Sequence, residues 1–271
     1  MPPKPAPTHF LCIPLVTPIS RPQLIQSLTS FRADVTSPTS FNIPDDAVRP
    51  VGTLHLTLGM FSFPSLPLPP AAVKDENTPE DGEAQSLLQQ ATELLHSLRL
   101  KEILASVGTG TTSATGDGLR ITLKGLHPMQ ASTPEKCAVL YAAPVDDAGT
   151  GTLQAFCERV RGVFVDAGLM VREERPLLLH ATLVNTVYVK GNGKAGKAGN
   201  GGKGGKGKGK GKGKWERLTV DARGVVERYE DQVWMEDVPV EGVAICKMGA
   251  RRMVVDGVED EAYEVVGEVS F

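Results

Sequence analysis

The stretch GTLHLTLGM, residues 52–60, alternates apolar and polar side chains around a histidine. Leucines occupy every second position from Leu54 to Leu58, and His55 and Thr57 lie between them. Because side chains of a β-strand point alternately to its two faces, the stretch predicts a strand with His55 and Thr57 on one face. Taken alone, this pattern is typical of any antiparallel strand with one face in water.

The same pattern returns in PLLLHATLVNT, residues 176–186. His180 and Thr182 fall on one face of a predicted strand, and their apolar neighbours fall on the other. Each histidine strand also follows an apolar run and a helix-like segment. Before His55 these are 10–16 and 20–31, and before His180 they are 137–145 and 151–168. We interpret the repeat as an internal duplication in which each half contains a strand, a helix and a histidine-bearing strand.

The length and composition suit one large domain or two fused lobes, because 271 residues with 41% hydrophobic residues can bury a sizeable core. The duplication predicts a bilobal α+β fold with antiparallel sheets, in which both histidine strands flank one groove. We place the domain at 8–271, with lobes of about 8–135 and 136–271, after a disordered N-terminus at 1–7. Further expected elements are a helix at 83–107, a strand at 119–126, a short helix within 217–232, and closing strands at 240–251 and 263–271.

The cysteines and the apolar runs indicate a protein of the cell interior. The four cysteines are far apart and lack metal-ligand spacing, which is typical of buried thiols in a reducing compartment. No apolar run reaches the ~18–20 residues of a membrane span, and the apolar run at 10–16 suits a first core strand better than a signal peptide. We expect an intracellular protein, nuclear or cytoplasmic, that is neither secreted nor bound to a membrane.

A segment rich in glycine and lysine follows the second histidine strand at 190–214. It contains nine lysines, twelve glycines and no acidic residue, and without these lysines the formal net charge of the chain would be −12 instead of −3. Because the segment has so little apolar surface to bury, we expect a disordered insertion. Two interpretations stay open: a spacer tolerated at a surface loop, or a segment that holds polyanions weakly.

Two histidines with neighbouring threonines suit the cleavage of a phosphodiester. One group must take a proton from the attacking oxygen, another must give a proton to the departing oxygen, and donors must hold the non-bridging oxygens. Histidine titrates near neutrality and suits both proton steps, while a threonine two residues away places a hydroxyl beside each imidazole. The sequence lacks metal-ligand spacing, a phosphate-binding glycine loop and a GxSxG motif, so we expect chemistry without a metal or a cofactor.

The paired segments HLTL at 55–58 and HATL at 180–183 resemble the two HxTx motifs of the 2H phosphoesterase superfamily. The longer segments HLTLGM and LLHATLVNTVY resemble the branch that contains activating signal cointegrator 1 complex subunit 1 and the A-kinase anchoring protein 7 phosphoesterase-like domain. The resemblance runs from about 8 to 189 and resumes at 215–250.

This resemblance implies a bilobal fold around a central groove. It also implies metal-free action on 2′,3′-cyclic, 2′,5′- or RNA 3′-end phosphodiesters, or nucleotide binding without catalysis. By motif match, the residues carried over are His55 and His180 as the catalytic pair and Thr57 and Thr182 as the phosphate-binding pair.

Three classes of function stay open at this point. The first is a metal-independent phosphodiesterase, and the second is a non-catalytic nucleotide (AMP-like) or RNA binding subunit of a nuclear transcription or repair complex. The third is a protein-interaction subunit that retains the groove without using it. In the first two classes the ligand is a nucleotide or an RNA end. The same phosphate donors would serve binding and catalysis, so the motifs do not separate these classes.

Tyr188 is a further candidate, because period 2 from His180 places it on the same strand face, where it would stack a base. A core or edge aromatic is the alternative interpretation. The other histidines, His9, His96 and His127, repeat no pattern, and we interpret them as surface or structural residues.

We predict that replacing 191–213 by a short Gly/Ser linker leaves stability and turnover of a mononucleotide unchanged, because a disordered insertion makes no packing contacts. The same deletion should modestly raise KM for oligonucleotides at low salt, and the difference should shrink as salt rises. Steady-state kinetics at two salt concentrations would measure this. Equal oligonucleotide kinetics at low salt would reduce the segment to a spacer.

Overall fold

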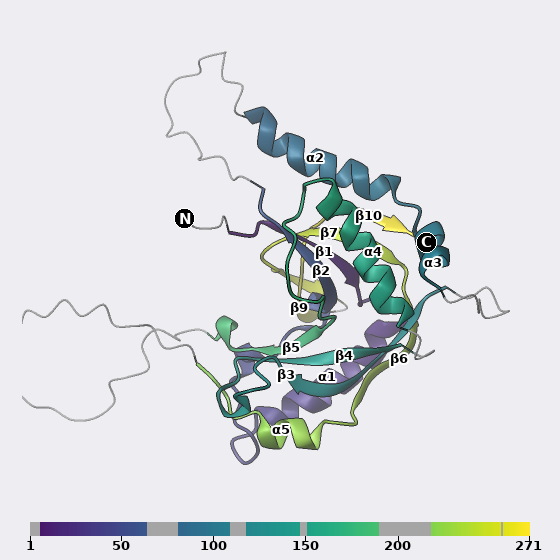
Figure 1. The fold of residues 1–271 in the computed structure, drawn as a ribbon. Helices are drawn as coiled ribbons and strands as arrows, with labels where there is room; N and C mark the ends of the chain where they lie inside the picture. The colour runs from purple at the N-terminus through teal and green to yellow at the C-terminus, as the bar shows by residue number, and fades with distance from the viewer. Residues whose placement is uncertain (1–5, 64–80, 109–117, 147–150, 190–217, 256) are drawn as a thin grey trace, which may run out of the picture.

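Two four-stranded antiparallel sheets form the centre of the protein (Figure 1). The computed structural model describes residues 6–63, 81–108, 118–146, 151–189, 218–255 and 257–271. Sheet A has the strand order β10 (Val265–Ser270), β7 (Gly242–Lys247), β1 (His9–Pro14) and β2 (His55–Phe61). Sheet B has the order β5 (Ala181–Asn185), β4 (Val139–Asp146), β3 (Arg120–Pro128) and β6 (Val233–Pro239). The predicted α+β class with antiparallel sheets is confirmed.

The two sheets repeat the same local arrangement. In each sheet the strand that begins at or directly after a motif histidine lies at the edge, and its antiparallel neighbour is the strand that begins the same half of the predicted repeat. Thus β2 pairs with β1, and β5 pairs with β4. This arrangement matches the internal duplication inferred from sequence.

The sheets do not follow the expected division of the chain near residue 135. Strand β3 comes before that point and belongs to sheet B, while β7 and β10 come after it and belong to sheet A. The physical reason is hydrogen bonding: β1 has a free edge after pairing with β2, and β7 supplies the missing partner from the C-terminal part of the chain. Sheet A therefore joins the two ends of the sequence.

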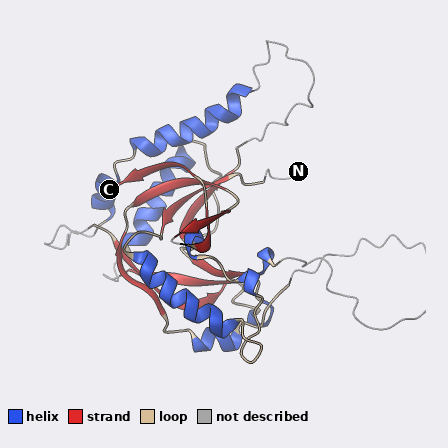
Figure 2. Cartoon of the chain, turned by 180° about the vertical axis from the view of Figure 1, so that it is seen from behind, coloured by secondary structure: helices blue, strands red, loops and turns tan. Residues whose placement is uncertain are grey.

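Each sheet is packed against the helix that follows the starting strand of the opposite half of the repeat. Helix α1 (Ser20–Val35) comes after β1 of sheet A but packs on β6 of sheet B. Helix α4 (Thr152–Asp166) comes after β4 of sheet B but packs on β2 of sheet A. Figure 2 shows the strands of both sheets in the middle of the molecule, with helices outside them. This exchange interlocks the two halves of the repeat.

Aromatic side chains fill both helix–sheet interfaces. On sheet B, Phe31 of α1 meets Trp234 of β6 edge to face, with ring centroids 5.0 Å apart. On sheet A, Phe164 of α4 meets Phe61 of β2 in a similar arrangement, with centroids 5.6 Å apart. All four side chains are almost completely buried, so each interface contributes a large apolar area to the core.

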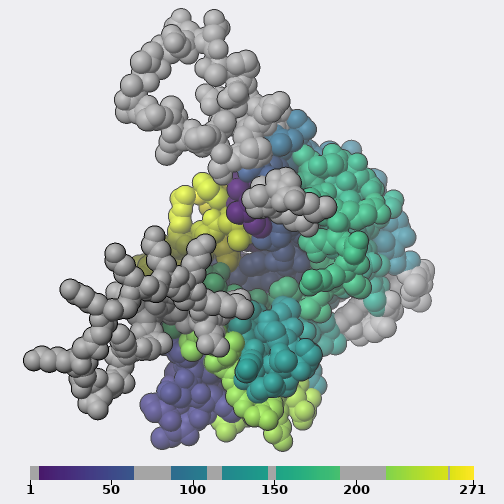
Figure 3. All heavy atoms as spheres, turned by 60° about the vertical axis from the view of Figure 1, so that its left-hand side comes forward, coloured from purple at the N-terminus to yellow at the C-terminus, as the bar shows by residue number. Residues whose placement is uncertain are grey.

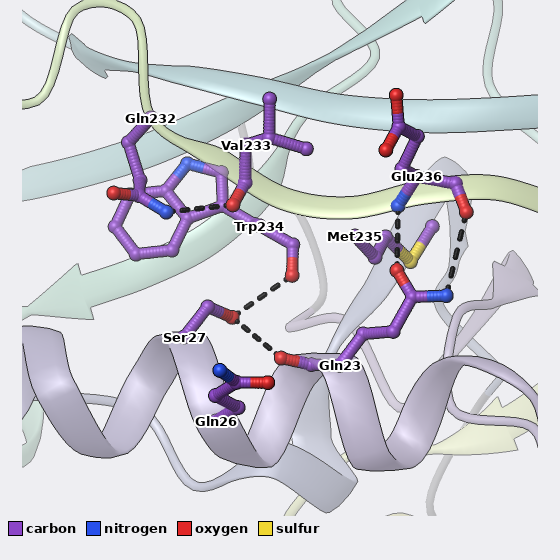
Figure 4. A pocket seen from close by; sticks show the side chains of 8 residues that line it. All are labelled: Gln23, Gln26, Ser27, Gln232, Val233, Trp234, Met235 and Glu236. Carbon is purple, nitrogen blue, oxygen red and sulfur yellow. Dashed lines mark hydrogen bonds between the residues drawn. The ribbon is translucent and has the colours of Figure 1, made fainter.

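Polar side chains of α1 also cover the open edge of sheet B (Figure 4). The Gln23 side chain accepts a hydrogen bond from the Glu236 backbone N–H at 2.8 Å and donates to the Glu236 carbonyl at 3.4 Å. The Ser27 hydroxyl donates to the Trp234 carbonyl at 2.8 Å. Because an edge strand leaves backbone groups unpaired, these contacts replace a missing neighbouring strand.

Most predicted elements are present, with three differences. The prediction of a single helix at 83–107 is wrong: α2 (Asp81–Ser97) and α3 (Leu100–Val107) form instead, and the turn between them lets α3 pack on α4.

Strand β6 was not predicted, because it is irregular, with a positive φ of 50° at Asp237 and shifts in its register with β3. The hairpin β8 (Arg251–Val255) and β9 (Val258–Ala262) was also not predicted, since its charged, exposed strands lack an apolar face. The predicted short helix is α5 (Arg223–Arg228).

Several expectations fall on residues outside the described ranges. These are the insertion at 190–214, most of the loop before α2, and residues 1–5 of the expected disordered N-terminus. All four cysteines are buried and not in disulfides, as predicted. Of the helices that the structure describes, none has the length and apolar character needed to span a bilayer.

We predict that Phe164→Ala lowers the free energy of unfolding by about 3–5 kcal/mol, because it leaves a cavity between α4 and sheet A. Urea denaturation followed by circular dichroism would measure this. Val171→Ala is the control: Val171 is 72% exposed, so its truncation should change the free energy by less than about 0.5 kcal/mol. A comparably small loss for Phe164→Ala would contradict the packing of α4 on sheet A.

Candidate active site between the two histidine strands

Both histidine motifs have the alternation that the sequence predicts. At the start of β2, Leu54, Leu56 and Leu58 are buried, while His55 and Thr57 are partly exposed. Around the start of β5, Leu179, Ala181 and Leu183 are buried, while His180 and Thr182 are partly exposed. The leucines and alanine anchor each strand in the core, and the polar pair of each motif is therefore held on the opposite face.

Each imidazole makes the same backbone hydrogen bond. The Nδ1 atom of His55 lies 2.8 Å from the Thr53 carbonyl oxygen, and that of His180 lies 2.9 Å from the Leu178 carbonyl oxygen. A carbonyl oxygen only accepts, so Nδ1 carries the proton and donates in both rings. Within the described part of the chain, neither Nε2 atom makes a hydrogen bond to the protein. With Nδ1 engaged in this way, Nε2 is the ring atom of each histidine that is left to exchange a proton with a ligand.

The two histidines, far apart in the sequence, come together in the fold. Strands β2 and β5 contact each other across the two sheets, and charge on His180 acts on His55. The pKa of His55 is lowered to about 4, chiefly by burial and also by the positive charges of His180 and Arg49, against the opposing effect of the Thr53 hydrogen bond. His55 is therefore uncharged at neutral pH.

The threonines of both motifs remain available for a ligand. Neither the Thr57 nor the Thr182 hydroxyl is hydrogen-bonded to another group among the described residues, and both side chains are partly exposed. Figure 3 shows the dark blue surface around β2 at the bottom of a hollow, between the yellow C-terminal strands and the green region that includes α4.

Aromatic rings flank both histidines, and sequence reasoning missed them. The imidazole of His55 lies against Phe10, at a centroid distance of 4.6 Å, and meets Tyr263 edge to face at 5.3 Å. These rings exclude water and account for the burial that lowers the pKa of His55. The ring of His180 meets Tyr141 edge to face at 5.5 Å. In the structure Tyr141 lies on the partly exposed face of β4 and pairs directly with Thr182. An aromatic residue within the apolar run at 137–145 was the feature of the sequence that could have indicated it.

His127, interpreted from sequence as a surface or structural residue, contacts the same tyrosine ring as His180. It pairs with Tyr141 across β3 and β4, and the two rings lie 5.5 Å apart. His127, Tyr141 and Thr182 therefore form one row across sheet B. This row extends the polar face of the second motif beyond the histidine strand.

Tyr188 does not continue the strand face on which the sequence placed it. Strand β5 ends at Asn185, and Thr186–Tyr188 form the 3₁₀ turn η4. The Asn185 side chain accepts a hydrogen bond from the Val187 backbone N–H at 3.1 Å and so stops the strand. The prediction that Tyr188 shares a strand face with His180 is therefore wrong. The stacking of a base on Tyr188 does not depend on that strand and stays a prediction.

Arg49 is a further residue of the site that sequence reasoning missed. It precedes η2 (Val51–Thr53), its backbone N–H donates to the Leu183 carbonyl at 2.8 Å, and its guanidinium lies 3.8 Å from the centre of the Tyr188 ring. The side chain is only 5% exposed. Arg49 thus connects the segment before His55 to the strand after His180, and no motif or spacing in the sequence indicated this.

The hairpin β8–β9 is fixed to the segment that holds His55. The buried Asp260 carboxylate accepts hydrogen bonds from the backbone N–H of Gly52 at 3.0 Å and from Arg21 at 2.7 Å. A Cβ atom on Gly52 would lie 2.4 Å from the Glu261 carbonyl oxygen, so only glycine allows this close approach. Because Thr53 follows Gly52 and accepts from His55, the hairpin positions the imidazole.

Metal ligands do not gather at this site in the described part of the chain. There, no three histidine, cysteine, aspartate or glutamate side chains lie close enough to hold a metal ion. The polar groups that do converge are imidazoles and hydroxyls, which can exchange protons and donate to the oxygens of an anion.

The family model of the AKAP7 2′5′ RNA ligase-like domain matches residues 83–271, well over half of the chain. The chain belongs to this family. The matched residues include His180 and Thr182, whereas His55 and Thr57 lie before them. The 2H phosphoesterase superfamily and the branch suggested by the sequence are confirmed.

Individual relatives of this AKAP7-like chain are distant. An uncharacterized protein of Schizosaccharomyces pombe is 26% identical over 132 residues, which are 49% of this chain and 50% of that protein. The matched region thus spans about half the length of that relative. Among solved structures, one described as a phosphoesterase has a TM-score of 0.44 at 15% identity and covers 97% of both chains. The Escherichia coli LigT structure with NADP+ has a TM-score of 0.43 at 15% identity and covers 98% of both.

We predict that His55 titrates with a midpoint at about pH 4 and carries its proton on Nδ1 at neutral pH. Long-range ¹H–¹⁵N correlation NMR of the imidazole would show both properties. Because the positive charge of Arg49 lowers the pKa of His55, Arg49→Gln should move the midpoint upward. A midpoint near 6.5 in the unaltered protein would contradict the packing of Phe10 and Tyr263 on the ring.

Proposed function

We propose that this protein is a metal-independent phosphodiesterase that acts on RNA or nucleotide phosphodiesters, of the 2′,3′-cyclic, 2′,5′-linked or RNA 3′-end type. The observation that carries the proposal is the matched pair of Nδ1 hydrogen bonds at 2.8 and 2.9 Å. They direct the reactive Nε2 atoms of His55 and His180 away from the backbone. Membership of the AKAP7 2′5′ RNA ligase-like family supports this class of substrate.

In the proposed reaction one imidazole gains a proton and the other loses one. The Nε2 lone pair of the base takes the proton of a water or a ribose hydroxyl as its oxygen attacks phosphorus. The Nε2–H of the acid gives its proton to the oxygen that departs as its bond to phosphorus breaks. The two rings return to their starting states by exchanging protons with solvent.

His55 is the base in this scheme. Its ring is neutral at pH 7 because burial and the charges of His180 and Arg49 lower its pKa, and a neutral ring with Nδ1 protonated can only accept at Nε2. His180 is then the group that must enter the reaction protonated. In the reverse direction the roles exchange.

Thr57 and Thr182 complete the scheme as donors to the non-bridging oxygens. Their hydroxyls have no protein partner in the described ranges and lie on the same strand faces as the imidazoles. Such donors are strongest toward charge that develops during reaction. We also retain Tyr188 as a stacking surface for a base: the residue is 43% exposed, and Arg49 lies over one face of its ring.

The experiment that tests the proposal is an assay of the purified full chain with EDTA present. The substrates are 2′,3′-cyclic nucleotides, 2′,5′-linked adenylates and short RNAs, followed by chromatography of the products. Turnover that EDTA abolishes would overturn the metal-free mechanism. Tight mononucleotide binding without turnover of any substrate would instead indicate the non-catalytic nucleotide-binding module.

We predict that His55→Ala and His180→Ala each lower kcat by about 10²–10⁴, the usual loss for a general acid or base. Thr57→Val and Thr182→Val should each cost about 1.5–3 kcal/mol, because each removes one donor to a charged oxygen and keeps the shape. Steady-state kinetics on a verified substrate would measure both. His96→Ala, at an exposed position of α2, is the control and should retain full activity. Full activity in either motif variant would disprove the paired acid–base scheme.

A further inference from the structure

A cavity lies beside the candidate active site. It has a volume of about 620 Å³ and is enclosed by α1, the 3₁₀ turns η1 (Asp45–Ala47) and η2, and the hairpin β8–β9. Its wall includes Arg49 and Tyr188 but none of the four motif residues. A group bound in this cavity would therefore be distinct from a phosphate held between the two histidines, although both would lie next to the same arginine.

Four arginines line this cavity, and their pairing differs. Three of them form ion pairs: Arg21 with Asp260 at 2.7 Å, Arg32 with Asp45 at 2.6 Å, and Arg252 with Glu261 at 4.0 Å. The fourth, Arg49, makes no ion pair with a carboxylate among the described residues. Its positive charge is therefore not neutralised by a neighbour in this part of the structure.

Arg49 also has a hydrogen-bond donor that the described protein does not satisfy. The side chain is 5% exposed, yet its Nη2 atom has no partner in the described ranges. The Nε atom of Arg21, in the same wall, is buried and unpartnered as well. Buried donors are almost always hydrogen-bonded, because an unpaired one has lost its water without compensation. A ligand oxygen in the cavity would supply the missing acceptor.

The remaining charges of the wall do not cancel this attraction. Asp46 and Glu259 also line the cavity, and their negative charges oppose an anion. Both residues are exposed at its rim, where water and salt screen them. Arg49 is buried, so its charge is screened far less. Guanidinium is also the side chain that best matches the geometry of phosphate oxygens.

We propose that this cavity binds a second phosphate group of the ligand through Arg49, while a first phosphate lies between His55 and His180. The inference rests on the proposed function and deepens it. The favoured substrate carries two phosphate groups, as in an oligonucleotide or in a dinucleotide with an additional terminal phosphate. Tyr188 holds the guanidinium in place by stacking, at 3.8 Å from the ring centre.

The test is calorimetric binding of two matched ligands to the full chain: a 2′,5′-linked adenosine dinucleotide with and without a 5′-phosphate. The unaltered protein should bind the phosphorylated dinucleotide at least about tenfold more tightly, the contribution of one good hydrogen bond to a charged group. Equal affinity for the two ligands, or binding of neither, would overturn the inference.

Variants then assign the preference to the cavity. Arg49→Gln should weaken binding of the phosphorylated ligand about 10–100-fold more than binding of the other, whereas Arg252→Gln, at the exposed rim, should keep the preference. If Arg49→Gln does not fold, the exposed Tyr188 provides the second test: Tyr188→Ala should lose most of the preference and Tyr188→Phe should keep it. Equal losses for both ligands in Arg49→Gln would place Arg49 at the histidine-bound phosphate and overturn a second site. A full preference retained in Tyr188→Ala, whatever the loss of overall affinity, would also contradict the site as described.

Binding and turnover separate this inference from the proposed function. A preference for the phosphorylated ligand, in a protein that turns over neither this ligand nor the cyclic nucleotides and short RNAs of the assay above, would contradict the phosphodiesterase and support the second phosphate site. Cleavage of both ligands without any preference would support the phosphodiesterase and overturn the second site.

Discussion

The exchange of helices between the two sheets is the constraint on which the rest of the structure depends. Helix α1 follows a strand of sheet A and buries its apolar face on sheet B, while α4 does the reverse. Each half of the repeat thus buries apolar side chains against the sheet that holds the other half's histidine strand. The relative position of the two edge strands, and with it the approach of His55 to His180, follows from this packing.

The duplicated motifs are equivalent in their backbone and different in their surroundings. Both imidazoles donate from Nδ1 to the carbonyl two residues earlier. His55 is then enclosed by Phe10 and Tyr263 and lies within the field of Arg49, whereas His180 meets Tyr141 in a more open setting. A symmetric pair would give two groups with the same proton affinity. In the mechanism proposed above, the lowered pKa of His55 keeps the base unprotonated before the reaction.

The hairpin β8–β9 gives the first motif a support that the second motif does not share in the described part of the chain. Asp260 fixes the hairpin to Gly52, and Tyr263, just after β9, covers His55. The same hairpin forms one wall of the cavity that contains Arg49. The hairpin therefore supports the burial of His55 and also forms a wall of the neighbouring cavity. A local change in the hairpin would affect the pKa of His55 and the shape of the cavity together.

The sequence by itself determined the two histidine strands, because strand periodicity is local and buried leucines set the face of each His–x–Thr pair. It also determined the repeat, the α+β class and the family resemblance. Only the tertiary structure decided the sheet partners, since β7 and β10 reach sheet A from the far end of the chain. Tyr141, Tyr263 and Arg49 join the site through contacts between distant segments, and Tyr188 leaves the strand because the Asn185 side chain ends it. Periodicity carries no information about such contacts, because they depend on how whole elements pack.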